Sequence, residues 1–300
     1  MRAPVSFFDL FQETLRLISS GRFVYGFGVV FGILALLATE LNQRVLPFIE
    51  SENTSPHTLI RTILDQQEIF LLTLGGLLIL GLLRSLLRGP YFLLMENMII
   101  QKLSIEKEFD LKPKVLRRSA WTTLSFEIGY LITLAILWVI ITLPLTIAFR
   151  LNPGAFELLL PFGLILITIL SIVFFYLKEF ALLYSLLAHS KPRLSLELSL
   201  KLFQKHTWLI LLFGLFLMAL AFLFTFVVNL VIIASDLIPL IWLQVGLSTV
   251  GTIVVFGLAE ATEETLRLLF FHTLAATPKP PVLKVKSLIE EKHPGSAPTV

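Results

Sequence analysis

The residues best placed to do chemistry are charged side chains that cluster around the ends of long apolar runs. Ionisable groups in apolar surroundings are costly, and they usually face other protein groups or a water-filled cavity. If the runs meet as helices, Arg84 or Arg88 should pair with a carboxylate on another run. That carboxylate should be Glu263 or Glu264. The whole group comprises Arg84, Arg88, Glu96, Lys178, Glu179, Glu260, Glu263, Glu264 and Arg267.

Two interpretations of this group remain open. As a polar ring where three helices meet, it could bind a lipid phosphate or gate a small cavity. Alternatively, the charges only mark where each apolar run leaves the membrane. Arg and Lys side chains would then extend their charged ends to water along apolar stems.

A second group of charges is purely basic: Lys112, Lys114, Arg117 and Arg118. Basic residues beside a membrane attract anionic lipid headgroups by about 1 kcal/mol each. The same residues also serve to orient a membrane protein, so a contact with anionic lipid is one of two roles they can have.

No catalytic, cofactor-binding or metal-binding pattern is recognisable. The chain has no cysteine, which excludes a thiol nucleophile, and its five histidines include no HxxxH pair. No GxSxG, P-loop or dinucleotide glycine pattern occurs. We therefore expect no metal, no cofactor, no enzymatic activity and no nucleic-acid partner.

The elements that carry these charges are predicted to be membrane-spanning helices. Hydrophobic residues make up 56% of the 300 residues and charged residues only 15%, which is typical of membrane proteins. A helix needs about 20 apolar residues to cross the hydrocarbon core, and a helix satisfies its own backbone there. Six segments qualify: Phe23–Leu41, Ile69–Leu87, Phe126–Phe149, Leu158–Leu177, Trp208–Ala234 and Pro239–Leu258.

The basic residues predict the orientation of these spans. With a cytoplasmic N-terminus, only Arg44, Arg61 and Arg150 of the 24 Lys and Arg residues fall outside. Basic residues concentrate in cytoplasmic connections. We therefore expect a multi-pass protein of the plasma (inner) membrane with both termini in the cytoplasm.

A threefold repeat is also predicted within one membrane domain, 1–276: an interfacial helix followed by a transmembrane hairpin, over about 4–105, 112–190 and 194–275. In the third repeat, Leu194 to Leu202 alternate with polar residues, which is typical of a strand. We expect a helix there, because an isolated strand beside a bilayer leaves bare edges. The outer connection Asn42–Glu68 has a possible amphipathic helix, and 277–300 is expected to be a disordered tail.

Small residues predict close helix contacts. Gly28 and Gly32 form a GxxxG pattern in the first span, and Gly75, Gly76 and Gly81 line the second. Such glycines let helix backbones approach closely, either within one chain or across a dimer interface.

Together with two sequence segments, this organisation resembles a known group of proteins. One segment, Leu202-Phe203-Gln204-Lys205-His206-Thr207-Trp208, leads into a span. A loosely similar segment, from Leu10-Phe11-Gln12-Glu13 to Gly21-Arg22-Phe23, leads into the first span. The chain resembles uncharacterised bacterial six-span membrane proteins and the membrane domain fused ahead of some glycerophosphodiester phosphodiesterases. The resemblance implies an inner-membrane protein. The catalytic His, Glu and Asp signature of the phosphodiesterases has no counterpart here, so their activity does not carry over.

The sequence thus predicts an all-α integral membrane protein. Its expected function is that of a non-enzymatic module that organises membrane lipids, or a membrane or cytoplasmic protein partner, at the cytoplasmic face. A small-solute channel or permease is the alternative, and an intramembrane enzyme ranks third.

Overall fold

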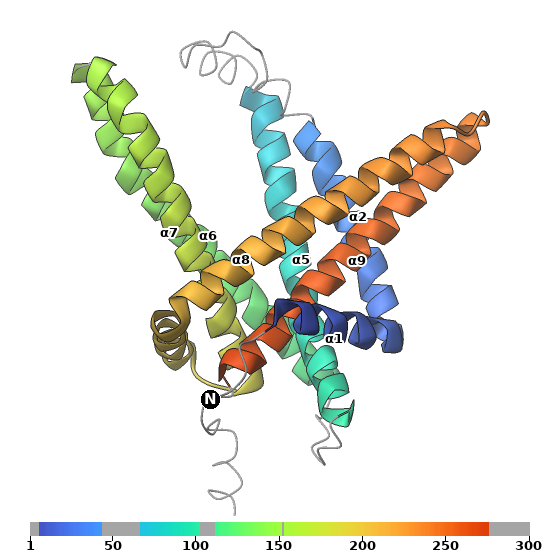
Figure 1. Ribbon diagram of the computed structural model, residues 1–300. Coiled ribbons are helices and arrows are strands. Elements are labelled where there is room, and N and C mark those ends of the chain that lie inside the picture. Colours follow the sequence, from blue (N-terminus) through green and yellow to red (C-terminus); the bar gives the residue numbers. More distant parts are fainter. Residues whose placement is uncertain (1–5, 44–66, 103–111, 152, 276–300) are drawn as a thin grey trace, which may run out of the picture. The chain divides into compact units, whose positions relative to one another are not determined.

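A computed structural model describes residues 6–43, 67–102, 112–151 and 153–275. These residues form helices and no strands (Figure 1). The helices are α1 (Phe7–Ser20), α2 (Arg22–Gln43), α5 (Gln67–Lys102), α6 (Pro113–Leu151), α7 (Pro153–Leu187), α8 (Pro192–Asp236) and α9 (Ile241–Ala275). The predicted outer amphipathic helix and the predicted disordered tail lie outside the described residues.

Six of these helices, all except α1, are long and apolar enough to cross a membrane. Five of them contain a whole predicted apolar segment and α9 contains most of the sixth, so the prediction of an all-α architecture with six apolar helices is confirmed for the described residues. The sixth begins at Ile241 rather than at Pro239. The chain turns between α8 and α9, where the Ile238 N–H donates to the Ser235 carbonyl at 3.0 Å.

Three of the long helices continue well beyond their apolar segments. α5 reaches Lys102, α7 reaches Leu187 and α9 reaches Ala275. These extensions carry eight of the nine charged residues of the first predicted group, as expected from the mixed composition that follows each apolar run, and Arg84 lies in the last turn of the first of these segments, Ile69–Leu87. They therefore place the charges on rigid helix rather than on loops.

The segments that precede the outward spans are helical in all three cases. α1 is separated from α2 at Gly21, and in Figure 1 the two helices lie at a steep angle to each other. α8 is interrupted at His206, which has non-helical backbone angles (φ −127°, ψ 26°). α6 runs on from Pro113 without a break. The repeat as a whole stays a prediction.

The alternating segment at the start of α8 is helical, as expected. Ser195 and Ser199 are fully buried, whereas Leu196 and Leu200 are about half exposed. The Ser199 hydroxyl donates to the Leu177 carbonyl at 2.7 Å. Ser195 and Ser199 thus face protein, four residues apart on one helical face, while Leu194, Leu196 and Leu200 are exposed and Leu202 is buried.

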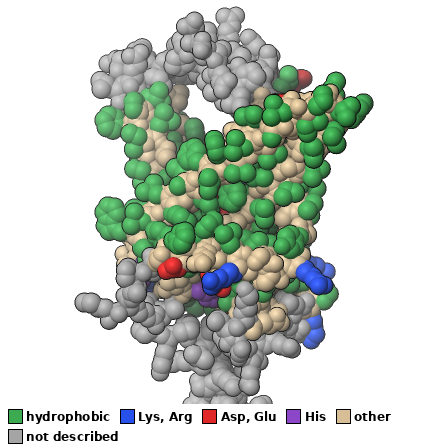
Figure 2. Space-filling model, turned by 45° about the vertical axis from the view of Figure 1, so that its right-hand side comes forward, with side chains coloured by type: hydrophobic (Ala, Val, Ile, Leu, Met, Phe, Trp, Pro, Cys, Tyr) green, Lys and Arg blue, Asp and Glu red, His purple; other side chains and the backbone are tan. Residues whose placement is uncertain are grey.

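Contacts within the chain divide it into two compact units. The large unit comprises Phe7–Ile128 and Leu212–Leu266. The small unit comprises Gly129–Leu211 with the described parts of Met1–Ser6 and Arg267–Val300. Many large hydrophobic side chains of both units are exposed, and green side chains are spread over the face that Figure 2 shows. An apolar exterior of this kind suits a lipid environment.

Glycines bring α2 and α9 together in the large unit. A Cβ added at Gly28 would lie 3.5 Å from the Gly257 carbonyl oxygen, and one at Gly257 would collide with the Gly28 carbonyl. A Cβ at Gly32 would collide with the Ile253 carbonyl. The GxxxG pattern therefore serves a close helix contact within the chain, one of the two predicted roles.

Aromatic side chains fill the neighbouring interior of the large unit. The Tyr91 ring of α5 lies with its centroid 5.6–6.2 Å from those of Phe23, Phe27 and Phe31 on α2. On α1, which precedes Gly21, the ring centroid of Phe7 lies 5.6 Å from that of Phe216 on α8. These contacts fix the rotation of α5 and so decide which of its residues face α9.

Candidate functional site

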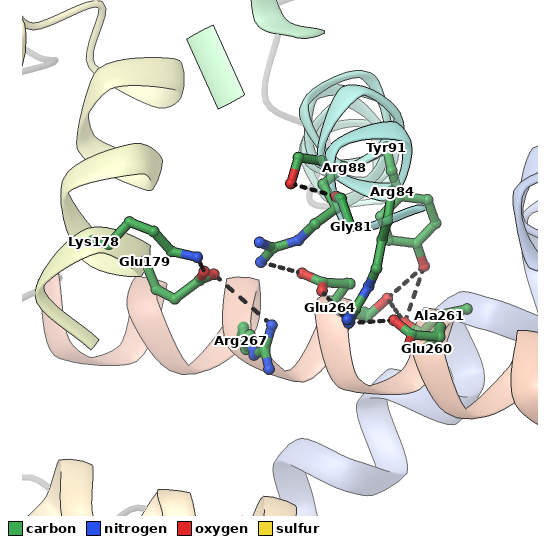
Figure 3. A network of polar contacts seen from close by, with 12 residues as sticks. Gly81, Arg84, Arg88, Tyr91, Lys178, Glu179, Glu260, Ala261, Glu264 and Arg267 are labelled. Carbon is green, nitrogen blue, oxygen red and sulfur yellow. Dashed lines mark hydrogen bonds and ion pairs between the residues drawn. The ribbon is translucent and has the colours of Figure 1, made fainter. Parts of the chain in front are cut away.

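Two arginines and two glutamates link α5 to α9 in the large unit (Figure 3). Arg84 and Arg88 lie one turn apart on α5, and Glu260 and Glu264 lie one turn apart on α9. The closest nitrogen–oxygen distances are 2.5 Å for Arg84–Glu260 and 2.8 Å for Arg88–Glu264. A third contact, Arg84–Glu264, is 3.6 Å. We call these four residues the Arg–Glu ladder.

The ladder runs from a buried pair to a more open one. The side chains of Arg88 and Glu264 are 5% and 0% exposed, whereas those of Arg84 and Glu260 are 38% and 17% exposed. The charges of Arg88 and Glu264 are therefore neutralised by each other instead of by water. Because two cations already face two carboxylates, the ladder is suited to joining helices more than to binding an anion.

Tyr91 and Thr265 extend the contact by one more turn, and the sequence analysis missed both. The Tyr91 hydroxyl donates to the Ala261 carbonyl at 3.1 Å and lies 2.8 Å from the Thr265 hydroxyl. Residues 84, 88 and 91 have the i, i+4, i+7 spacing of one helical face. That spacing was the signal in the sequence that could have identified Tyr91 as part of the contact. For Thr265, the signal was its position directly after Glu264, a predicted site residue.

A second cluster lies within the small unit. Lys178 and Glu179 are buried, and their closest charged atoms are 3.0 Å apart. Arg267 approaches the other oxygen of Glu179 at 3.9 Å. The Lys178 ammonium lies 4.6 Å from the centroid of Tyr130, within the range of a cation–π contact. Burial with these partners indicates a structural role for the cluster.

The structure contains the expected pairings Arg84–Glu264 and Arg88–Glu264, and adds Glu260 as a partner of Arg84. Glu96 is buried on α5, at 7% exposure. Glu263 is half-buried and lines a pocket between α8 and α9 instead of forming part of the ladder. The pocket has a volume of about 150 Å³.

The basic group at the start of α6 is exposed throughout. Lys112, Lys114, Arg117 and Arg118 are all exposed, and Trp121 is 60% exposed. Residues 114, 117, 118 and 121 have the i, i+3, i+4, i+7 spacing of one helical face. We call Lys112, Lys114, Arg117 and Arg118 the basic stripe.

The opposite face of α6 is held against α5. Ser119 and Thr123 are buried, and a Cβ added at Gly89 of α5 would collide with the Ser119 carbonyl and the Thr123 hydroxyl. This tight contact fixes the rotation of α6 about its axis. The basic stripe is therefore presented outward by a helix that cannot turn it inward.

Comparison with known protein families, curated proteins and solved structures finds no match for this chain. The resemblance to the six-span domain fused to glycerophosphodiester phosphodiesterases stays a prediction. Within the described residues, no group of three or more His, Cys, Asp or Glu side chains could hold a metal ion.

Proposed function

We propose that this chain is a non-enzymatic, multi-pass membrane protein that gathers anionic lipid headgroups at the cytoplasmic face. The basic stripe carries the proposal. It places four exposed cations next to an exposed tryptophan on a helix whose rotation is fixed. Tryptophan favours the interface between headgroups and acyl chains, so Trp121 would hold the stripe at headgroup depth.

The magnitude of this attraction is sufficient for selective binding. Four basic residues at about 1 kcal/mol each give at most about 4 kcal/mol, or roughly a thousandfold preference for an anionic surface. The ladder cations cannot supply the same attraction, because carboxylates already neutralise them. Salt should strongly weaken the attraction between the basic stripe and anionic headgroups, since the Debye length falls from about 10 Å at 0.1 M to about 3 Å at 1 M.

The test is the lipid retained by the purified protein. We expect the wild-type chain in an uncharged detergent to retain phosphatidylglycerol over phosphatidylcholine in native mass spectrometry. Replacing Lys112, Lys114, Arg117 and Arg118 by Gln should lower that preference at least tenfold. A control that replaces the exposed Arg16, Arg193, Lys201 and Lys205 by Gln removes the same charge elsewhere. Equal loss in both variants, or no loss in the first, would contradict the proposal.

A small-solute channel or permease is a second candidate, favoured by one observation. The pocket between α8 and α9 brings Glu260 and Glu263 to a lining that is otherwise apolar except for Thr225. Ionisable residues between apolar helices often mark a solute pathway. Flux of small organic cations into proteoliposomes should then exceed that into empty liposomes, and equal rates would remove this candidate.

A further inference from the structure

Asn229 of α8 is a polar side chain on the outside of an apolar helix. Largely apolar runs flank it, Leu209–Val228 before it and Leu230–Ala234 after it. It lies seven residues before the end of α8 at Asp236, which is about 10 Å along the helix. The side chain is exposed. In a membrane it would therefore meet hydrocarbon, where a carboxamide without a partner is costly.

Three exposed threonines on the apolar helices satisfy their hydroxyls within their own helix. Thr146, Thr168 and Thr225 each donate to the carbonyl four residues earlier, at 2.8–2.9 Å. Asn229 makes no such bond, and its side chain forms no hydrogen bond within the described residues. A carboxamide carries two N–H donors and one carbonyl acceptor, so it needs partners of both kinds. Asn229 therefore differs from these threonines in requiring a group from outside its own helix.

Contacts with α9 fix Asn229 on the outer side of α8. Val228 is 6% exposed, and a Cβ added at Gly251 of α9 would collide with the Val231 side chain. Successive helical residues point about 100° apart. With Val228 and Val231 on the inner side, Asn229 points away from α9. The packing of α8 thus holds the carboxamide outside the helix pair.

The residues around Asn229 form an uncovered apolar face. Phe222, Phe226 and Ile233 are 70%, 59% and 59% exposed. Together with Asn229 they have the i, i+4, i+7, i+11 spacing of one helical face. We call these four residues the Asn229 face. One polar residue among large apolar ones is the pattern of a helix interface that a single polar pair aligns.

A second copy of the chain is the occupant that this chemistry fits. A lipid acyl chain offers a carboxamide no hydrogen-bonding group. Two copies with the same orientation in a membrane are related by a twofold axis along the membrane normal, so a residue near that axis meets its own counterpart. A carboxamide is self-complementary, because the N–H of each copy donates to the carbonyl oxygen of the other. A buried Asn of this kind sets the register and the number of strands in parallel helix pairs.

We propose that the chain forms a parallel homodimer through the Asn229 face of α8. The Asn229 side chains of the two copies exchange two hydrogen bonds, and Phe222, Phe226 and Ile233 pack around them. The proposal rests on the chain being a membrane protein, as proposed above. It does not rest on the basic stripe or on the binding of anionic lipid.

The first experiment measures association of the full chain in phosphatidylcholine liposomes. Gln12→Cys, at an exposed position of α1, is the only cysteine and carries a donor or an acceptor dye. We expect energy transfer that falls as the protein is diluted with lipid, as for a dimer in equilibrium with monomers. Asn229→Leu should raise the dissociation constant of the dimer about tenfold, the size expected for hydrogen bonds between membrane helices. Flotation with liposomes after an alkaline carbonate wash checks membrane insertion separately.

Three control variants make the result specific. Asn229→Gln keeps the carboxamide and should restore most of the affinity that Asn229→Leu loses. Thr168→Leu removes an exposed hydroxyl that is already bonded within its own helix, so it should not change association. The variant in which Gln replaces the basic stripe should associate as the wild type does.

The outcomes separate clearly. Weakened association in Asn229→Leu, with Thr168→Leu unchanged, supports the dimer, and unchanged association in Asn229→Leu overturns it. The thermal midpoint of monomeric Asn229→Leu in detergent should be equal to that of the wild type or higher, because an exposed amide has left apolar surroundings. A lower midpoint would indicate a partner within the chain and would overturn the proposal. So would an inserted protein that stays monomeric at every protein-to-lipid ratio, which would leave lipid or another membrane protein on this face.

The second experiment identifies the helix at the interface. Phe226→Cys places a single cysteine on the Asn229 face, and Val250→Cys places one on α9. Both residues are 59% exposed, and they lie about 15 Å and 14 Å along their helices from the turn that joins α8 and α9. A disulfide needs Cα atoms within about 7 Å of each other, so oxidation in liposomes should link copies of Phe226→Cys and not of Val250→Cys. Equal yields of linked dimer would overturn the assignment to α8.

Discussion

Arg88 and Glu264 lie 176 residues apart in the chain, yet they form the most buried ion pair of the ladder, at 2.8 Å. A buried pair contributes little net stability compared with apolar residues, but removing one partner leaves an uncompensated charge. Arg84 stands 3.6 Å from the same carboxylate and would offset part of that loss. At the scale of the residue, the ladder therefore specifies how two helices face each other.

We predict that Arg88→Leu lowers the free energy of unfolding by about 3 kcal/mol, the lower end of the range for breaking a buried pair. The double variant Arg88→Leu with Glu264→Leu should recover most of that loss, because no buried charge is then left alone. Reversible unfolding in mixed micelles, followed by circular dichroism, measures both.

The matched control is the exposed pair of α1, Arg16 and Glu13, at 3.5 Å. Surface pairs contribute about 0–1 kcal/mol, so Arg16→Leu should have little effect. A double variant no more stable than Arg88→Leu would contradict the account of the ladder as mutual neutralisation.

At the scale of the element, α2 and α9 approach through backbone atoms. Gly28, Gly32 and Gly257 each face the other helix, where a Cβ would touch or collide with a main-chain carbonyl. Backbone cannot move aside as a side chain can, so the helices would have to separate. This contact also sets the rotation of α9, on which the ladder and the pocket depend.

We predict that Gly32→Ala and Gly257→Ala each destabilise the protein by about 1–3 kcal/mol, the usual cost of overpacking. Gly26→Ala is the control, because a Cβ there would meet nothing within 4 Å. Alanine is the better helix former by up to about 1 kcal/mol, so this control should be neutral or stabilising. Midpoints of thermal unfolding in detergent measure these changes in stability. A Gly257→Ala protein as stable as the wild type would show that α2 and α9 do not approach so closely.

At the scale of the whole molecule, the six apolar helices and the bias of basic residues predict the arrangement across the membrane. The absence of cysteine makes this arrangement easy to map, since any introduced cysteine is the only one in the chain. An orientation with the basic stripe in the cytoplasm is a condition of the proposed function.

We predict that Lys114→Cys is labelled by a membrane-impermeant maleimide only after cells are opened. Asn53→Cys, in the outer connection, should be labelled on intact cells. The reverse pattern would place the basic stripe outside, where the positive-inside rule does not allow it, and would remove the support for anionic lipid binding at the cytoplasmic face.

The sequence by itself determined the number and type of the long helices. Apolar runs of sufficient length must be helical in lipid, because only a helix satisfies its own backbone there. It also placed most of these charges on the continuations of three helices, and one of its two interpretations had arginines of α5 meeting glutamates of α9. The helical form of the segment from Leu194 to Leu202 followed from the same argument, against its alternating pattern.

Only the tertiary structure decided which glutamate of α9 faces the arginines of α5 and which one lines the pocket. Glu263 and Glu264 are neighbours in sequence, but successive helical residues point about 100° apart, so packing alone chooses the one that faces α5. The glycine contact with α2 turns Glu264 and Glu260 toward the arginines and leaves Glu263 in the wall of the pocket. Such a choice depends on contacts between residues far apart in the chain, which spacing within one helix does not reveal.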